Sequence, residues 1–436
     1  MTSVSWRAAK CTRRDWLKSA LAATAGLAAA TPPGFAAAVD SEAFVPARAI
    51  TSGPRFHWFG YYDKLEFDPT NRYVLSNEVE FEHRTPTASD RIQVGMVDTQ
   101  DADKWIPLGK SDAWGWQQGC MLQWRPGTEG EVLWNDREDG RFVCHILDVK
   151  TGAKRTLPKP VYSVSPDGKW AVTADFARIQ AMRPGYGYQG IPDPYADQKS
   201  PQDSGIWRLN LETGDSQLIV SLADVVQILH QGEDLRPHWN YFNHLLINPD
   251  GTRFIFLHRW RKEVATPTGR SLGGFITRMF TANLDGSDLH VLDPSGHTSH
   301  FIWRDPQHVC AWTKPEGRKA AFYLFEDQTP NVEIVGDGVM AVNGHNTYVP
   351  IGSGTEWILN DTYPDRTRRQ TPYLFHVPTG RRVELGHFYL PPEYQGEWRC
   401  DLHPRCSRDG RTVAIDSPHG GAGRQVWLLD ISRIVG

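Results

Sequence analysis

Cysteine is scarce in this chain of 436 residues, which contains six. Cys11 lies in an N-terminal segment that we expect to be cleaved off, so an odd number remains in the processed chain. An odd number does not describe a disulfide framework. Spacing alone leaves two pairings open, Cys120 with Cys144 and Cys400 with Cys406. The sequence therefore excludes a small domain held together mainly by disulfides.

Long apolar runs and basic tracts are also missing beyond the first 38 residues. A membrane-spanning helix needs about 20 consecutive apolar residues, so we expect no stable membrane insertion of the processed chain. The formal net charge is −4 at pH 7. Without a basic patch, the chain has no electrostatic footprint for nucleic acid. We therefore expect neither a membrane nor a nucleic acid as a partner.

The N-terminal segment has the features of an export signal. Arg13 and Arg14 precede a short Ala-rich apolar stretch, and Ala36-Ala37-Ala38 offers small residues for cleavage. This order resembles a twin-arginine signal peptide over residues 1–38 and predicts a periplasmic or secreted protein. The alternative, a membrane anchor, requires a longer apolar stretch.

Turn-forming and aromatic residues are abundant, with 39 glycines, 30 prolines and 17 tryptophans. A turn signal followed by alternating apolar residues recurs seven times, in FDPTNRYVL, WRPGTEGEVLW, VSPDGKWAV, INPDGTRFIF, WRDPQHVCAW, VPIGSGTEWIL and CSRDGRTVAI. An apolar strand ending in Asp, Asn or Thr-Gly recurs between them, also seven times. Two tandem β-sandwiches would need a linker, and no Ser-, Gly- or Pro-rich break is present. We therefore predict an all-β fold, one seven-bladed β-propeller over residues 39–436.

A long insertion, residues 175–205, separates the third and fourth repeats. It is rich in Pro and Gly and contains Arg178, Arg183, Tyr186 and Tyr188. Long ordered loops in a compact domain are commonly functional. We expect this insertion to contribute residues to a site.

Histidine occupies one equivalent position in four consecutive repeats, four residues ahead of each turn: His244, His300, His345 and His403. Equivalent positions in a propeller lie around one axis, so we expect these imidazoles to face one another near the central channel. Asp401 lies two residues before His403, on the same strand face if no bulge intervenes. Neutral imidazoles with a carboxylate suit Mn²⁺ or Zn²⁺ better than Ca²⁺, which prefers oxygen ligands. The predicted metal ligands are His300, His345, His403 and Asp401.

His244 stands at the edge of this set, next to the stretch RPHWNYFNH with Arg236 and His238. We predict that these three residues contact the substrate. The high content of Trp, Tyr and Arg favours a sugar with carboxylates, because Arg binds carboxylates through two parallel hydrogen bonds.

The chain resembles the seven-bladed propeller polysaccharide lyases of the oligogalacturonate lyase type, and distantly the ulvan and rhamnose–glucuronate lyases. The resemblance is strongest in SHFIWRD, GHNTYVP and WRCDLHPRCSRDG. It implies a Mn²⁺ site to which His300 and His403 correspond, whereas Asp401 and Trp398 stand where that family has His and Gln. The stretch RPGYGY is similar to the loop that supplies a catalytic tyrosine in ulvan-lyase-like propellers, which makes Tyr188 the candidate.

The resemblance implies a lyase that acts as a monomer on acidic oligosaccharides or polysaccharides by metal-assisted β-elimination. Such a reaction needs a cation to neutralise the uronate carboxylate and a base to remove the C5 proton. Arg183 or Arg236 is the predicted cation, and His244 or Tyr188 the predicted base. A propeller glycoside hydrolase that uses His57 and Asp63 and acts on rhamnose–glucuronate linkages is one alternative, and a non-catalytic binding propeller resembling TolB is another.

Overall fold

The computed structural model describes residues 41–266 and 269–436. The predicted export signal, residues 1–38, lies outside the described residues. Within the described part, none of the helices is both long and apolar enough to cross a membrane.

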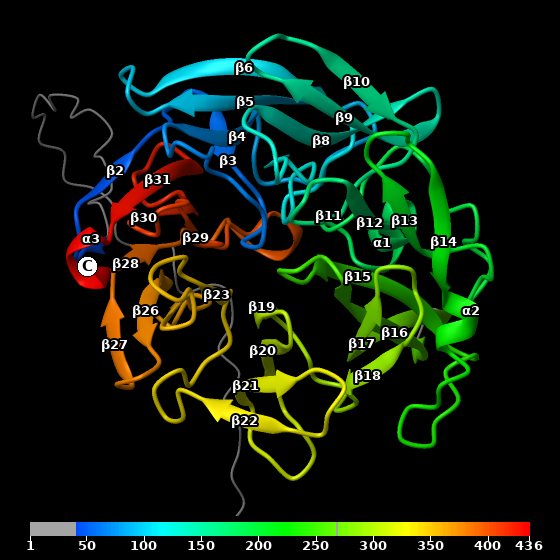
Figure 1. Cartoon of the computed structure of the whole chain (residues 1–436). Coiled ribbons are helices and arrows are strands. Elements are labelled where there is room, and N and C mark those ends of the chain that lie inside the picture. The colour runs from blue at the N-terminus through cyan, green and yellow to red at the C-terminus, as the bar shows by residue number, and fades with distance from the viewer. Residues whose placement is uncertain (1–40, 267–268) are drawn as a thin grey trace, which may run out of the picture. The chain divides into compact units, whose positions relative to one another are not determined.

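Seven four-stranded antiparallel sheets form the blades of a propeller and surround a common centre (Figure 1). Blade 1 contains β3 (Phe56–Trp58), β4 (Tyr73–Val79), β5 (Ile92–Asp98) and β6 (Lys104–Ser111). Blade 2 contains β7 (Gln123–Trp124), β8 (Glu131–Glu138), β9 (Arg141–Asp148) and β10 (Lys154–Leu157). Blade 3 contains β11 (Ser163–Val164), β12 (Trp170–Ala174), β13 (Gly205–Asn210) and β14 (Ser216–Ser221). Blade 4 contains β15 (Trp239–Ile247), β16 (Arg253–Thr266), β17 (Gly269–Asn283) and β18 (His290–Asp293).

The remaining blades follow the same order, with the first strand of each blade innermost. Blade 5 contains β19 (Phe301–Asp305), β20 (His308–Thr313), β21 (Ala321–Glu326) and β22 (Val332–Val335). Blade 6 contains β23 (Thr347–Tyr348), β24 (Trp357–Asn360), β26 (Tyr373–His376) and β27 (Arg381–Glu384). Blade 7 contains β29 (Arg405–Cys406), β30 (Thr412–Ser417), β31 (Gln425–Asp430) and β2 (Ala47–Ala49). The predicted class and the number of blades are confirmed, and each predicted turn lies between the first two strands of a blade.

Blade 7 takes its outer strand from the start of the described chain. In β2, Ala47 pairs with Leu429 of β31 in antiparallel register. The seam with blade 1 is held by a buried guanidinium: Arg405 donates to Glu66 at 2.8 and 2.9 Å and to Asp416 at 2.9 Å. The ring is thus closed by backbone pairing and by a buried ion-pair network.

The core lies between and within the blades, because alternate residues of each strand face the neighbouring sheet. Trp58, Trp114 and Trp116 pack on one another with ring centroids 5.2–5.6 Å apart, and they are core residues. All five described cysteines are free, so neither pairing left open by the sequence forms.

Few elements lie outside the blades. A small sheet joins β1 (Glu42–Ala43), β28 (Gly386–Tyr389) and β25 (Arg369–Gln370), and the helical elements are α1 (Phe176–Met182), α2 (Leu222–Val225), η1 (Gly396–Trp398) and α3 (Ser432–Val435). The insertion begins with α1, whose first turn is capped by the Asp175 side chain. The buried Arg178 ties the insertion down through Asp193, at 3.0 Å, and the backbone carbonyls of Tyr195 and Gln198. Arg178 is therefore a structural residue.

Candidate active site

Four histidines from blades 4 to 7 gather at the centre of the ring, as their register predicts. His345 lies between His300 and His403, with ring centroids 4.3 Å from each. The ring of Tyr61 bridges the remaining gap, because it lies 5.0 Å from both His244 and His403. All four histidines are at most 5% exposed. The inner-strand positions therefore form one buried cluster, which we call the histidine cluster.

Two of these histidines have a left-handed backbone, with φ of +52° at His244 and +42° at His403. The register of β15 shifts at this point, between Asn243 and Leu246. Left-handed residues other than glycine are uncommon, and backbone strain of this kind concentrates at functional sites. Asp401 and His403 therefore converge through an irregular turn of the chain, and not through the strand alternation that we expected.

The predicted metal ligands His345, Asp401 and His403 offer ligand atoms that all lie within 4.8 Å of one another. Nε2 of His403 and Oδ1 of Asp401 are buried and have no hydrogen-bond partner among the described residues. Buried polar atoms rarely stay unpaired. These atoms therefore fit a bound cation, and a nitrogen-rich set with one carboxylate suits Mn²⁺ or Zn²⁺.

A second histidine–carboxylate group, on blade 2, provides a contrast. Asp136, Glu138 and His145 also lie within 4.8 Å of one another. Here Asp136 accepts backbone hydrogen bonds from Asp112 and Arg137, and both ring nitrogens of His145 have partners. This group is satisfied by the protein itself and gives no sign of a missing ligand.

Neighbouring side chains orient the imidazoles of the cluster. Nδ1 of His345 lies 2.9 Å from Asp361, which can only accept, so Nδ1 donates and Nε2 faces the cluster. Nδ1 of His300 lies 2.9 Å from Oδ1 of Asn343 and donates likewise. Nε2 of His300 makes a long contact, 3.5 Å, with the Tyr363 hydroxyl. Sequence reasoning missed Asp361 because this residue follows a different strand of blade 6.

Burial sets the charge of the cluster. It lowers the pKa of His300 and of His403 well below the usual histidine value, and the neighbouring His345 adds to the effect. Burial also acts to lower the pKa of His345, but the Asp361 carboxylate outweighs it and raises that pKa. His300 and His403 are therefore neutral imidazoles, the form that binds a metal.

Tyr61 and Tyr62 of blade 1 form the floor of the cluster. The Tyr62 hydroxyl donates to the carbonyl of Phe301 at 2.8 Å and accepts from its N–H at 3.1 Å. The Tyr62 ring lies 5.4 Å from that of His345. Both tyrosines therefore pack against the histidine cluster from blade 1.

Two guanidiniums lie beside the cluster without a carboxylate partner among the described residues. They are Arg183, at the end of α1, and Arg259, in β16, whose Nε donates to Thr277 at 3.0 Å; each has a buried Nη1 with no hydrogen-bond partner. Both stack on Phe275, with 4.6 and 4.5 Å from Cζ to the ring centroid. Their charges help to lower the pKa of His244 and His300. The predicted cation Arg183 thus reaches the site, and Arg259 joins it.

The insertion brings Tyr186 to the site and keeps Tyr188 away from it. The Tyr186 ring lies 5.6 Å from that of His244, and its hydroxyl accepts from Arg399 at 2.7 Å. Burial alone would raise the pKa of Tyr186, but the charges of Arg183 and Arg399 lower it to about 8. Tyr188 instead stacks on Phe176 at 4.2 Å, accepts from Asn135 at 2.9 Å, and has a pKa raised well above its usual value by burial.

The structure does not bring Arg236 and His238 to the histidine cluster. Arg236 forms an exposed ion pair with Asp234, at 2.8 Å, and His238 contacts Glu233 at 3.0 Å. Both precede β15 in a surface loop, whereas His244 lies deep in the strand. In the same way, the ring nitrogens of His57 contact Gln425 and Glu78.

Fold and site together define a seven-bladed β-propeller with a histidine–aspartate centre on its axis. Solved oligogalacturonate lyases have the same fold. The enzyme from Vibrio parahaemolyticus matches with a TM-score of 0.62 and 12% identity, over 91% of this chain and 98% of its own. An oligogalacturonate lyase in complex with manganese matches with a TM-score of 0.62 and 13% identity, over 90% and 96%. No protein-family model and no curated protein sequence matches the chain. The chain therefore has an oligogalacturonate lyase-like propeller fold.

Proposed function

We propose that the histidine cluster is the active site of a lyase that cleaves uronic-acid-containing glycans by β-elimination. The supporting observation is that metal-ligand atoms without hydrogen-bond partners, and two guanidiniums each with an unpaired Nη1, all lie around the same buried histidine cluster. A uronate places a carboxylate next to the C–H bond that must break, so one substrate group can engage both features. Export through the predicted signal of residues 1–38 would place the enzyme in the periplasm or outside the cell.

Arg183 and Arg259 would bind the substrate carboxylate. Each has a free N–H, and a carboxylate accepts such donors in pairs. Neutralising the carboxylate stabilises the charge that develops when the C5 proton leaves. A divalent metal held by His345, His403 and Asp401, with His300 beside them, would supply Lewis-acid polarisation of the same carboxylate.

Tyr186 is the proposed base that removes the C5 proton. Its pKa of about 8 leaves a useful phenolate fraction near neutral pH. The electrons of the C5–H bond become the C4–C5 double bond, while the bond from C4 to the glycosidic oxygen breaks. This assignment replaces Tyr188, whose hydroxyl is committed to the core.

His244 is the proposed donor to the leaving oxygen. Gln118 points its Nε2 at Nδ1 of His244, at 3.4 Å, while its Oε1 accepts from Tyr162 at 3.0 Å. This arrangement favours the proton on Nε2 of His244. Because burial keeps His244 neutral, this N–H can donate a hydrogen bond to the glycosidic oxygen as the C4–O bond breaks, and the leaving oxygen takes its proton from water.

The test is ultraviolet absorbance of the C4–C5 unsaturated product, with purified processed protein and a panel of uronate-containing polysaccharides. We expect absorbance to rise and chelator to suppress the rise. Release of reducing sugar without absorbance would instead indicate hydrolysis, and the absence of both products would indicate a binding propeller.

A further inference from the structure

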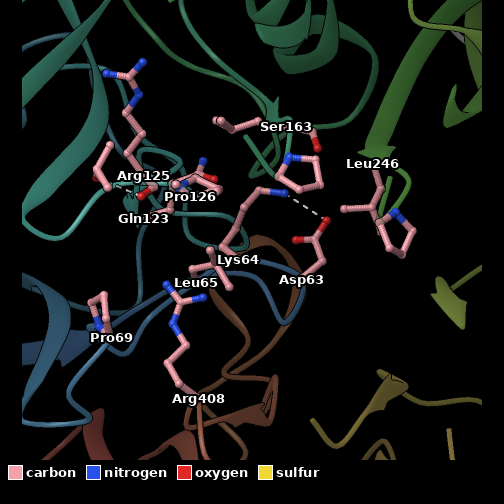
Figure 2. Close-up of a pocket in the computed structure, with 15 residues that line it drawn as sticks. Asp63, Lys64, Leu65, Pro69, Gln123, Arg125, Pro126, Ser163, Leu246 and Arg408 are labelled. Atoms are coloured by element: carbon pink, nitrogen blue, oxygen red, sulfur yellow. Dashed lines mark hydrogen bonds and ion pairs between the residues drawn. The ribbon is translucent and has the colours of Figure 1, made fainter. Parts of the chain in front are cut away.

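A cavity opens at the turn ends of the inner strands, away from the ends at which the histidines lie. Its volume is about 610 Å³, within the range of small-molecule sites. Inner-strand residues of blades 2 to 4, the segment after β3 in blade 1 and Arg408 of blade 7 line it, together with four turn prolines, Pro69, Pro126, Pro166 and Pro249. Figure 2 shows Lys64 and Asp63 at its centre, with the Arg408 side chain directed toward them. We call it the lower cavity.

The polar centre of the lower cavity is an incompletely satisfied ion pair. Nζ of Lys64 lies 2.8 Å from Oδ2 of Asp63, and the two side chains are 4% and 6% exposed. Oδ1 of Asp63 is buried and has no hydrogen-bond partner in the described part of the chain. An ammonium has three donors, and the Asp63 contact uses one of them. A hydroxyl fits this pair, because it can donate to Asp63 and accept from Lys64.

The lining has one uncompensated positive charge. Arg125 pairs with Glu131 and Glu212, and Glu212 also pairs with Arg155, so these two cations and two carboxylates balance. Arg408 donates its Nε to the carbonyl of Phe67 at 2.9 Å, and within residues 41–266 and 269–436 it forms no ion pair with a carboxylate. Since Asp63 and Lys64 cancel, the charge that remains favours an anion.

We propose that the lower cavity binds a hydroxylated monoanion of the sugar-acid class, such as a hexuronate. Its carboxylate pairs with Arg408, and its hydroxyls bridge Asp63 and Lys64. The described lining contains one carboxylate, Asp63, whereas glycoside hydrolysis commonly uses two. The cavity is therefore a binding site, and it requires no activity at the histidine cluster.

Calorimetric titration of the full processed chain with D-galacturonate, in the presence of chelator, tests this site. We expect binding that weakens by about tenfold or more in Arg408→Gln, because a charged hydrogen bond is lost. The double variant Asp63→Asn/Lys64→Gln should weaken it similarly while leaving the net charge of the lining unchanged. Arg411→Gln, in the same turn but outside the cavity, is the matched control. D-galactose, which lacks the carboxylate, should bind at least about tenfold more weakly.

The outcomes distinguish the lower cavity from the histidine cluster. If D-galacturonate binding survives both lower-cavity variants but disappears in Arg183→Met, only the histidine cluster binds it and the proposal fails. Absence of binding by both D-galacturonate and its trimer also overturns it. Binding of the trimer alone, lost in Arg408→Gln, supports a site for the end of a chain, and binding of the monosaccharide supports a site for the free acid. Neither result depends on the lyase assay.

Discussion

The two ends of the propeller channel use opposite chemistry, although the inner strand β15 contributes to both, with His244 at one end and Leu246 at the other. The upper end contains neutral histidines, unpaired guanidiniums and a phenol of lowered pKa. The lower cavity contains a charge-compensated Asp63–Lys64 pair and no histidine in its lining. The difference shows that positions a few residues apart on one inner strand can belong to two sites of different chemistry, the proposed active site and the proposed binding site.

The strongest test of the upper end is His403→Ala. Removing this imidazole should lose bound metal, and turnover should fall by at least about a thousandfold, while circular dichroism keeps the strand signal. Metal content by elemental analysis and absorbance of the unsaturated product measure the two losses. His145→Ala, in the satisfied group of blade 2, should keep full metal content. Normal turnover in metal-free His403→Ala would end the metal hypothesis.

The next largest effect is expected for Tyr186→Phe. Loss of the phenol should lower kcat by about a hundredfold or more, as for a general base. In the unmodified enzyme, kcat/KM should rise with pH up to about 8, because the phenolate is the active form. Tyr188→Phe, two residues away, should lower stability but leave this pH profile in place. If the profile persists in Tyr186→Phe, the base is another residue.

A smaller effect is expected for Asp361→Asn, which keeps the shape next to His345 but removes the charge. Metal affinity should fall by about tenfold, the usual effect of a partner that orients a metal-binding histidine. Titration against a competing chelator measures it. An unchanged affinity would show that the Asp361 contact serves folding alone.

The smallest effect concerns acid stability. Burial keeps the folded pKa of His244 and His258 well below the unfolded value near 6.5, so the folded state binds fewer protons. Their stabilisation is present above about pH 6.5 and is lost as the pH falls below it, by up to about 1.4 kcal/mol per pH unit for each group. Urea unfolding with chelator at several pH values measures the slope. His258→Gln should flatten it, whereas Arg408→Gln should not change it.

Much of the fold and half of the site could be predicted from the sequence, because each turn signal marks where the first strand of a blade ends and the second begins. Once the inner strand of each blade is known, histidines at the same distance ahead of the turn are expected to meet near the axis. Arg259 and Asp361 were missed because one lies on a second strand and the other directly follows one, and how far such residues reach toward the axis depends on blade twist and not on sequence spacing. Within the insertion, sequence spacing likewise does not tell which of Tyr186 and Tyr188 reaches the site. Gly187 packs against α1 so closely that a Cβ would lie 2.3 Å from Gln180 N, and this packing decides which tyrosine faces the site.

The outer strand of blade 7 has a consequence for the folding order. Thr51 accepts a hydrogen bond from Val426, 375 residues further along the chain, so the ring can close only after the last blade has formed. Contacts so distant in sequence form slowly. Until closure, blade 7 exposes an open edge that can pair with another chain. The few residues of β2 therefore cover the open edge of blade 7 and complete the ring. Their loss should increase aggregation of newly made chains more than it lowers the stability of any single blade.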